Sequence, residues 1–421
     1  MDVRKHGHIL IICALFFSWT QNCNAQASGS PPGSDNPFSL SATYIGDLFG
    51  NVAGGEEQGI RYFDNIDINL EVDLEKLGSP VLSGTTVYAY GLGNQGGSIS
   101  ELAGDVQGVS NIEAETSWRL YEVWAQKKFF LLNSSLLMGL YDINSEFNYL
   151  QSSQLFLNSS HGLDPTIALS GTLGPSTFPH TSMGARLKLN PWRGLVWQAA
   201  LLDGVPSDPG NTRGTKIKFR EDDGLFLITE LSLHSVDQDK LHLRGQKRRL
   251  SNYLGREVDA DNSIGIGGWM YTDKRDSWRP NGQKNYEYGI YALGEYKFAD
   301  KDNQWPEAHF FSRVGMSNPS VSELSFFGGG GVALSGVLQS NKKDVVGFAV
   351  AYTQSSTNYR EQVLISGQTP EMAETNYEWT YRFQLHPYIQ LQADVQYVVN
   401  PGFDAELSNA WIFGLRNIIS F

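Results

Sequence analysis

The chain has 421 residues and a formal net charge of −13 at neutral pH. This acidic balance argues against a nucleic-acid partner, because binding to phosphates requires a basic face. The 44 glycines and the frequent Tyr, Phe and Trp favour strands and tight turns over helices, although a soluble enzyme would share the 41% of hydrophobic and 18% of charged residues.

The first 25 residues have the pattern of a secretory signal peptide. Basic residues at positions 4 and 5 precede an apolar run, and small residues surround a cleavage point after Ala25. The apolar run is far shorter than the roughly 20 residues of a membrane-spanning helix. Both cysteines, Cys13 and Cys23, lie in this segment, so the exported chain is predicted to have no disulfide. A flexible polar lead-in is predicted at 26–37, followed by one domain at 38–421.

From Phe38 onward, segments of about ten residues alternate between apolar and polar side chains, with turn-rich pieces between them. Near the C-terminus, Tyr377 and Trp379 share one parity, whereas Glu378 and Arg382 share the other. Because successive side chains of a strand point to opposite faces, each such segment has one apolar and one polar face.

A soluble β-sandwich would alternate too, but two features favour a membrane barrel. Aromatic residues are frequent toward the ends of the apolar faces, as the interfacial girdles of a barrel require. The polar faces carry charges and amides in strand after strand, whereas a soluble barrel fills its interior with apolar side chains. We therefore predict an all-β, transmembrane antiparallel β-barrel of about 16 strands. The strands are predicted to begin near Phe38, Ile60, Thr85, Trp118, Ser135, Thr181, Gly194, Gly224, Ser263, Tyr286, Glu307, Leu324, Asp344, Thr375, Tyr388 and Asn409.

The last predicted strand supports the same class of protein. Trp411, Phe413, Leu415 and the terminal Phe421 share one face, which Asn417 interrupts. This resembles the aromatic-terminated strand that outer-membrane proteins present to their insertion machinery, so that machinery is a predicted partner.

Several segments in order along the chain resemble the carbohydrate-selective porins of the OprB family. The resemblance implies a bacterial outer-membrane barrel of about 16 strands that takes up glucose or other small sugars. His161 stands where the family pattern has an aromatic residue. The segments are YDINSEF at 141–147, LFLNSSHG at 155–162, GARLKLNPW at 184–192, LLDGVPSDPG at 201–210, DDGLFLITELSL at 222–233, FSRVGMSNPSVSELSFFGGGGVALSGVL at 311–338 and HPYIQLQADVQYVVNPG at 386–402.

A sugar channel needs carboxylates, amides and guanidinium groups for the hydroxyls, beside aromatic surfaces for the C–H faces. Asp142, Asn144 and Glu146 alternate, so in an extended chain they face the same way, and we predict that they restrict the pore. The Ser-rich stretch after them is expected to fold inward. The alternative is that these side chains only bind the loop to the wall. The other side chains predicted to face the lumen, each of which could also be generic solvated wall, are Arg186, Glu230, Glu378, Arg382, Asp394, Gln396 and Arg416.

No motif predicts catalysis, a cofactor or a metal site. Ser160, His161 and Asp164 are triad residue types, but a triad is defined by geometry. The glycines at 328–331 lack the Lys-Ser/Thr of a phosphate loop and are better explained as a strand on a crowded inner wall. The histidines have no metal-ligand spacing.

Two other functions stay open at this stage: a general porin without sugar preference, and an exported soluble carbohydrate-binding protein or glycosidase. The predicted partners are small sugars, outer-membrane lipid and lipopolysaccharide, with a basic run at 247–249 as a candidate contact. The sequence does not choose between a monomer and a homotrimer.

Overall fold

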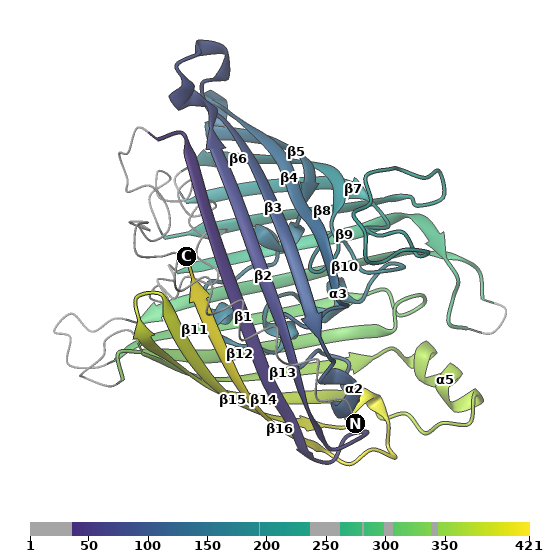
Figure 1. Cartoon of the computed structure of the whole chain (residues 1–421). Helices are drawn as coiled ribbons and strands as arrows, with labels where there is room; N and C mark the ends of the chain where they lie inside the picture. Colours follow the sequence, from purple (N-terminus) through teal and green to yellow (C-terminus); the bar gives the residue numbers. More distant parts are fainter. Residues whose placement is uncertain (1–35, 193, 236–261, 280–281, 299–305, 338–343) are drawn as a thin grey trace.

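The computed structural model describes residues 36–192, 194–235, 262–279, 282–298, 306–337 and 344–421. In this described part, sixteen antiparallel strands form a closed barrel, which confirms the predicted fold class. Each strand pairs with its neighbours in the chain, and β1 (Phe38–Ala53) pairs with β16 (Ala410–Ser420) to close the wall (Figure 1). In lipid such closure is required, because an open edge would leave backbone groups without partners.

The remaining strands are β2 (Gly59–Asp73), β3 (Thr85–Gly96), β4 (Ser117–Phe129), β5 (Ser134–Tyr141), β6 (Ser182–Trp192), β7 (Leu195–Asp203), β8 (Leu225–His234), β9 (Ser263–Arg275), β10 (Asn285–Phe298), β11 (Glu307–Ser317), β12 (Leu324–Ser335), β13 (Val345–Ser355), β14 (Ala373–His386) and β15 (Ile389–Val399). The predicted strand starts differ from these by no more than two residues. The predicted signal peptide, most of the lead-in and the basic run at 247–249 lie outside the described residues. Within the described residues, no helix has both the length and the apolar character needed to span a membrane.

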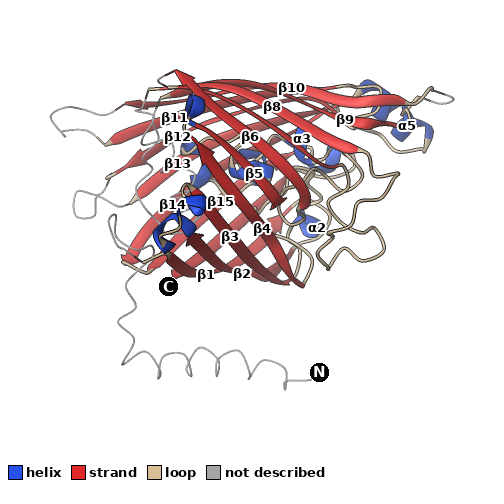
Figure 2. Ribbon diagram, turned by 90° about the horizontal axis from the view of Figure 1, so that it is seen from above, coloured by secondary structure: helices blue, strands red, loops and turns tan. Residues whose placement is uncertain are grey.

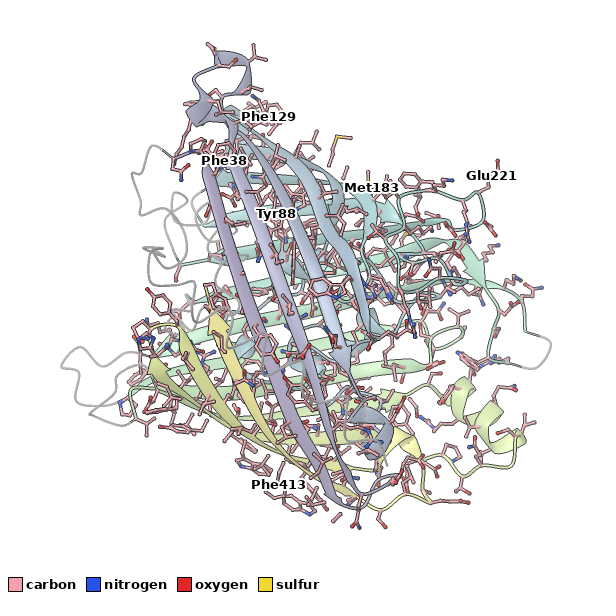
Figure 3. The ribbon with its side chains drawn as sticks, viewed as in Figure 1. Phe38, Tyr88, Phe129, Met183, Glu221 and Phe413 are labelled. Atoms are coloured by element: carbon pink, nitrogen blue, oxygen red, sulfur yellow. The ribbon has the colours of Figure 1, made fainter. Side chains whose placement is uncertain are left out.

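The two strand faces point as the alternation predicts. On β14, Trp379 is 43% exposed on the outer surface, whereas the neighbouring Glu378 is fully buried on the inward face. On β16, Phe413 projects away from the barrel (Figure 3), and Arg416 points inward. The soluble alternatives are therefore wrong, because a soluble protein would not place its aromatic residues outside and its charges inside.

Two long connections turn into the barrel. We call residues 97–116, between β3 and β4, the first inner loop, and residues 142–181, between β5 and β6, the second inner loop. Figure 2 shows α3 within the ring of strands. The helices are α2 (Ser100–Ala103), α3 (Pro165–Ala168) and α5 (Thr357–Ile365), and the 3-10 turns are Leu74–Leu77, Pro80–Leu82, Leu131–Asn133, Ile143–Ser145, Ser152–Leu155, Ser159–His161 and Pro401–Phe403.

The two inner loops pack on two apolar clusters of the inner wall. The second inner loop contributes Phe147, Leu150 and Phe156 to a cluster that includes Trp269 and Tyr291 of the wall. The first inner loop contributes residues such as Ile99, Leu102 and Val109 to a cluster with Ile45 and Phe49 of β1. Part of the inward surface is thus apolar, because it faces packed protein and not water.

Small residues make room for the second inner loop on strands β12 and β13. A Cβ on Gly347 would lie 2.6 Å from Leu155 and 2.8 Å from Phe156, closer than real side-chain contacts allow. On β12, Gly329 and Gly331 pair with inward-facing residues of β11, as predicted for a crowded inner wall. Gly328 and Gly330, however, share the outward parity, so the prediction holds for half of this run.

Candidate functional site

The second inner loop is held by carboxylates of the barrel wall. Glu230 accepts a hydrogen bond from the backbone N–H of Asn148 at 2.8 Å, and Glu295 accepts from both the N–H and the hydroxyl of Ser152 at 2.9 Å. The buried backbone donors of an irregular loop need partners, and ionised acceptors bind them most strongly. The further pairs are Glu122 with Asp142, Glu287 with Gly171, and Glu378 with Leu157 and Asn158.

Arg313 binds four carbonyl groups of the same loop. The Arg313 guanidinium on β11 donates to the carbonyls of Ser160 and His161 at 3.1 Å, of Asn148 at 2.7 Å and of Gly162 at 3.3 Å. Its side chain is 2% exposed. Arg313 therefore fixes two separate stretches of the second inner loop against one strand, which positions the loop across the lumen.

His161 fills the place of an aromatic residue in the second inner loop. Its ring lies 5.1 Å from the ring of Phe156 and 5.7 Å from that of Phe311, and it is 1% exposed. Burial, with a smaller contribution from the Arg313 charge, lowers the His161 pKa to about 3. The ring is therefore neutral at physiological pH, so its approach to Glu378, at 3.8 Å, is not an ion pair.

The expectation that Asp142, Asn144 and Glu146 face one way in an extended chain is wrong. Asp142 accepts a hydrogen bond from the Asn144 N–H at 2.8 Å and so starts the 3-10 turn Ile143–Ser145. Aspartate readily closes such turns with its own side chain, which competes with extended structure. As a result the three side chains diverge, and Asn144 donates to the Gly162 carbonyl at 3.0 Å within the loop.

Glu146 instead lies in a charged cluster where the second inner loop meets β6. Its carboxylate is 2.6 Å from Arg186 Nε and 3.5 Å from Lys188 Nζ. Arg186 also donates to Gln126 at 2.7 Å and to the Ser135 hydroxyl at 2.7 Å. Arg186 is buried and the Glu146 side chain is 8% exposed, whereas Lys188 is 18% exposed, so this cluster presents its lysine to the lumen.

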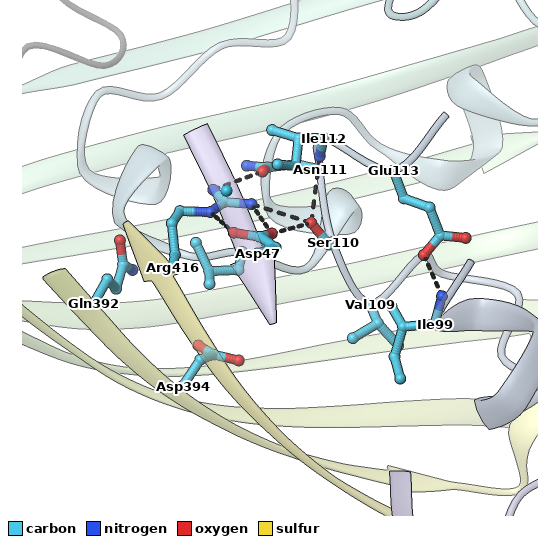
Figure 4. A network of polar contacts seen from close by, with 12 residues as sticks. Asp47, Ile99, Val109, Ser110, Asn111, Ile112, Glu113, Gln392, Asp394 and Arg416 are labelled. Atoms are coloured by element: carbon cyan, nitrogen blue, oxygen red, sulfur yellow. Dashed lines mark hydrogen bonds and ion pairs between the residues drawn. The ribbon is translucent and has the colours of Figure 1, made fainter. Parts of the chain in front are cut away.

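The first inner loop is held by a second ion pair. Arg416 of β16 makes two 2.7 Å contacts with Asp47 of β1, which is the bidentate geometry of a strong pair. The same guanidinium donates to Asn111 at 2.9 Å and to Ser110 at 3.0 Å (Figure 4). Glu374 of β14 accepts from three backbone N–H groups, those of Val106, Gln107 and Gly402.

The remaining predicted lumen residues lie on inward faces but differ in what they contact. Gln396 donates to the Val109 carbonyl of the first inner loop at 2.8 Å and to Asp394 at 2.9 Å, and both side chains are buried. Arg382 is partly exposed on the inward face of β14. Of the predicted set, Asp142, Asn144, Glu146 and Arg382 are half-buried, and the other side chains are buried.

Sequence reasoning missed an aromatic cluster on the inward face of β3 and β4. The rings of Tyr88 and Trp124 stack at 5.0 Å, and those of Tyr90 and Tyr121 meet edge to face at 4.9 Å. The Tyr90 hydroxyl donates to Asp67 at 2.6 Å. The parity shared by Tyr88 and Tyr90 in TTVYAYGLG was the available signal. Asp47, Glu295 and Arg313 were missed too, because no local pattern shows which inward charges bind a loop.

Among the described residues, no group of three or more His, Cys, Asp or Glu side chains could hold a metal ion.

Comparison with known proteins points to one family. Residues 57–421 match the family model of the carbohydrate-selective porins, OprB family. The structure is similar to the high-pH structure of Pseudomonas putida OprB, with a TM-score of 0.77 and 18% identity over 91% of this chain and 94% of that chain. The low-pH structure of the same protein matches with a TM-score of 0.55 and 14% identity over 91% and 93% of the two chains.

A more distant likeness is to the outer-membrane channel DcaP of Acinetobacter baumannii, with a TM-score of 0.51 and 11% identity over 91% of this chain and 97% of that chain. No curated protein matches the chain. At sequence identities of 11% to 18%, the likeness to these solved structures shows the fold alone.

Proposed function

Because the chain belongs to the carbohydrate-selective porin OprB family and is a porin of the bacterial outer membrane, we propose that it carries glucose and similarly small sugars into the periplasm by passive diffusion. The observation that carries this proposal is the cluster of Glu146, Arg186 and Lys188 where the second inner loop meets the wall. A carboxylate beside a lysine offers both an acceptor and a donor to sugar hydroxyls.

The proposed sugar contacts are Glu146, Lys188 and Arg382, with the partly buried Tyr90 as an aromatic surface. Each net hydrogen bond to a hydroxyl contributes about 0.5–1.5 kcal/mol. A few of them give a binding free energy near −4 kcal/mol, a dissociation constant of about 1 mM. Weak binding suits a channel, because a tightly held sugar would not be released.

Glu230, Glu378, Asp394, Gln396 and Arg416 act in this proposal as positioning residues. Their side chains are buried and bind the inner loops or one another. They determine the width of the lumen without touching the sugar. Arg186, Asp142 and Asn144 belong to the same group, because their polar atoms bind the second inner loop or the wall.

Block of single-channel conductance by glucose tests the proposal. We expect millimolar glucose to reduce the current of the wild-type protein, and Lys188→Gln to raise the half-blocking concentration severalfold, since it removes one charged donor. Lys297→Gln is the matched control, because Lys297 lies in another ion pair, with Glu307 at 2.8 Å, near the end of β10. Absence of any glucose block, with solute entry into liposomes dependent on size alone, would identify a general porin instead.

We propose that the protein performs no catalysis, since a porin needs only a gradient. Incubation with glucose oligosaccharides should leave them intact, and released monosaccharide would contradict this. The outward Trp411, Phe413 and Leu415 of β16 are the proposed signal for the insertion machinery, and lipopolysaccharide remains a proposed partner of the outer surface.

A further inference from the structure

The two inner loops are hydrogen-bonded to each other inside the barrel. The Asn111 N–H of the first inner loop donates to the Leu157 carbonyl of the second at 2.8 Å. In the opposite sense, the Ser159 N–H donates to the Gly108 carbonyl, also at 2.8 Å. The later residue of one loop thus pairs with the earlier residue of the other, so the two segments run in opposite directions, as in a short piece of antiparallel sheet.

We call residues 107–111 and 156–160 together the loop joint, and its packing depends on close approach of the two loops. Gly108 has a φ of +77°, and a Cβ at this position would lie 2.8 Å from the Ser159 hydroxyl oxygen. A side chain would therefore be strained here and would separate the loops. The buried side chain of Leu157 belongs to the second inner loop but packs in the apolar cluster of the first.

Asn111 connects the loop joint to the barrel wall. Its side-chain oxygen accepts a hydrogen bond from Arg416 of β16 at 2.9 Å (Figure 4). Its side-chain nitrogen donates to the Phe156 carbonyl of the second inner loop at 3.4 Å. Together with the backbone bond to Leu157, these contacts bind Asn111 to the wall and to the other loop.

The wall holds both halves of the loop joint from neighbouring strands. Gln396 of β15 donates to the Val109 carbonyl at 2.8 Å and accepts from the Asn158 amide at 3.4 Å, so it touches both loops. Glu378 of β14 accepts from the Asn158 N–H at 3.1 Å. Because β14, β15 and β16 are adjacent, the joint lies against one side of the barrel, whereas other contacts of the second inner loop reach β8, β10 and β11.

We propose that Asn111 is a positioning residue that couples the two inner loops, so that they narrow the channel as one unit and together limit the size of the sugars that pass. The inference rests on the proposed function, because it concerns the same passage. An irregular loop can open locally at little cost, but two loops that share hydrogen bonds and an apolar contact must open together. A change in the first inner loop should therefore loosen the second.

Hydrogen exchange of the protein in lipid vesicles tests this coupling. Asn111→Ala removes the side-chain contacts with Arg416 and Phe156. We expect amide exchange at 152–161, in the other loop, to become about threefold to tenfold faster, which is the effect of losing one or two ordinary hydrogen bonds.

Ser98→Ala is the matched control. The Ser98 hydroxyl also lies in the first inner loop, but it binds the Glu113 carboxylate and the Glu101 N–H within that loop. This variant should speed exchange in the first inner loop alone. Unchanged exchange at 152–161 in Asn111→Ala, or the same acceleration there in Ser98→Ala, would overturn the proposal.

Entry of sugars of different size into liposomes gives a functional readout. The wild type should admit glucose faster than a disaccharide, and Asn111→Ala should raise the rate of disaccharide entry relative to glucose severalfold. An unchanged ratio would show that the loop joint does not limit solute size. The ratio depends on size and not on block by glucose, so failure of this inference and failure of the proposed sugar selectivity are distinguishable.

A disulfide across the loop joint provides a rescue experiment. A Cβ on Gly108 would lie 3.1 Å from the Ser159 Cβ, close to the roughly 3.8 Å that a disulfide spans. Replacing Ser159 also removes the hydroxyl that a side chain at position 108 would meet. In the Asn111→Ala background, oxidation of Gly108→Cys/Ser159→Cys should return the exchange at 152–161 and the disaccharide ratio toward wild type, and reduction should reverse this. Absence of the cross-link, or a cross-link that restores neither measurement, would contradict the coupling.

Discussion

Inward-facing carboxylates of this barrel have two different tasks, which their local partners determine. Glu378 is fully buried and accepts from the N–H groups of Leu157 and Asn158, so its oxygens bind groups inside the protein. Glu146, in the second inner loop, pairs with Arg186 and with Lys188, which is 18% exposed, so its cluster reaches the lumen. The alternation of residues in β14 predicts the side of the wall on which Glu378 lies but not its partners, and Glu146 lies in a loop that has no such alternation.

The packing of the second inner loop is expected to weaken in acid because of His161. The pKa of His161 is lowered from its usual 6.5 to about 3 in the packed loop. Below pH 6.5, the His161 ring is protonated when the loop is released but stays neutral when the loop is packed. The packed state is therefore destabilised progressively as the pH falls from 6.5 toward 3. At pH 5, about 1.5 units below 6.5, the free energy of loop packing is weakened by about 2 kcal/mol, since each pH unit contributes about 1.4 kcal/mol. His161→Phe should remove this dependence, as measured by hydrogen exchange of residues 142–181 at pH 7 and pH 5.

The buried carboxyl group of Asp164 is expected to give loop packing the opposite pH dependence. Burial raises its pKa from 3.8 to about 6, so its contribution to packing is present at low pH and is lost as the pH rises through 6. Asp164→Asn should therefore strengthen packing at pH 7 relative to pH 5, the reverse of His161→Phe. An unchanged pH dependence in His161→Phe would show that the buried ring does not control the loop.

The second inner loop behaves as a structural element without regular secondary structure. Only short turns and the four-residue α3 occur in it, yet polar contacts bind it to β4, β8, β10, β11 and β14. These contacts satisfy backbone groups that neither a helix nor a sheet would pair. The shape of the loop, and with it the width of the lumen, is therefore determined by the wall.

Removal of one wall contact should loosen this loop and widen the channel. Glu295→Ala leaves the buried N–H and hydroxyl of Ser152 without an acceptor, at a cost of about 1–3 kcal/mol for each group. We expect faster hydrogen exchange around Ser152, noisier single-channel current and weaker glucose block. Arg313→Met, which removes the donor to four carbonyls, should have a larger effect.

Glu307→Ala is the control for these variants, because Glu307 pairs with Lys297 and contacts neither inner loop among the described interactions. Equal loosening by Glu307→Ala would mean that general destabilisation of the barrel is responsible.

At the scale of the whole molecule, closure and the two-sided wall define a membrane protein. The pairing of β1 with β16 leaves no open sheet edge, and the outward side chains form an apolar belt. Stability therefore depends on which solvent each face meets, lipid outside and water or packed loop inside.

The two faces should respond differently to the same charged substitution. Trp379→Arg places a cation on the lipid face and should lower the free energy of unfolding by about 2–4 kcal/mol, measured by urea titration in lipid vesicles. Gln384→Arg, on the inward parity of the same strand near its end, should have little effect. The same loss of stability for both variants would contradict the assigned orientation of β14.

Much of the fold could be predicted from residue parity alone. The predicted strand starts and the outward position of Trp379 are confirmed, and Glu230, Glu378 and Arg416 face inward as expected. The site could be predicted less well. Asp142 was expected in extended chain but closes a turn, and the entire first inner loop, with its ion pair between Asp47 and Arg416, has no local signal.

The sequence by itself determined on which side of the wall each strand residue lies. Side chains in a strand alternate with a period of two, and sixteen strands repeat that pattern. The partner of each inward charge was decided by tertiary structure. Glu230 and Glu378 bind backbone groups that are 82 and 221 residues away in the chain. Every residue except proline has a backbone N–H, so the sequence does not indicate which one binds a carboxylate. Only folding of the loops into the barrel brings these donors to the wall.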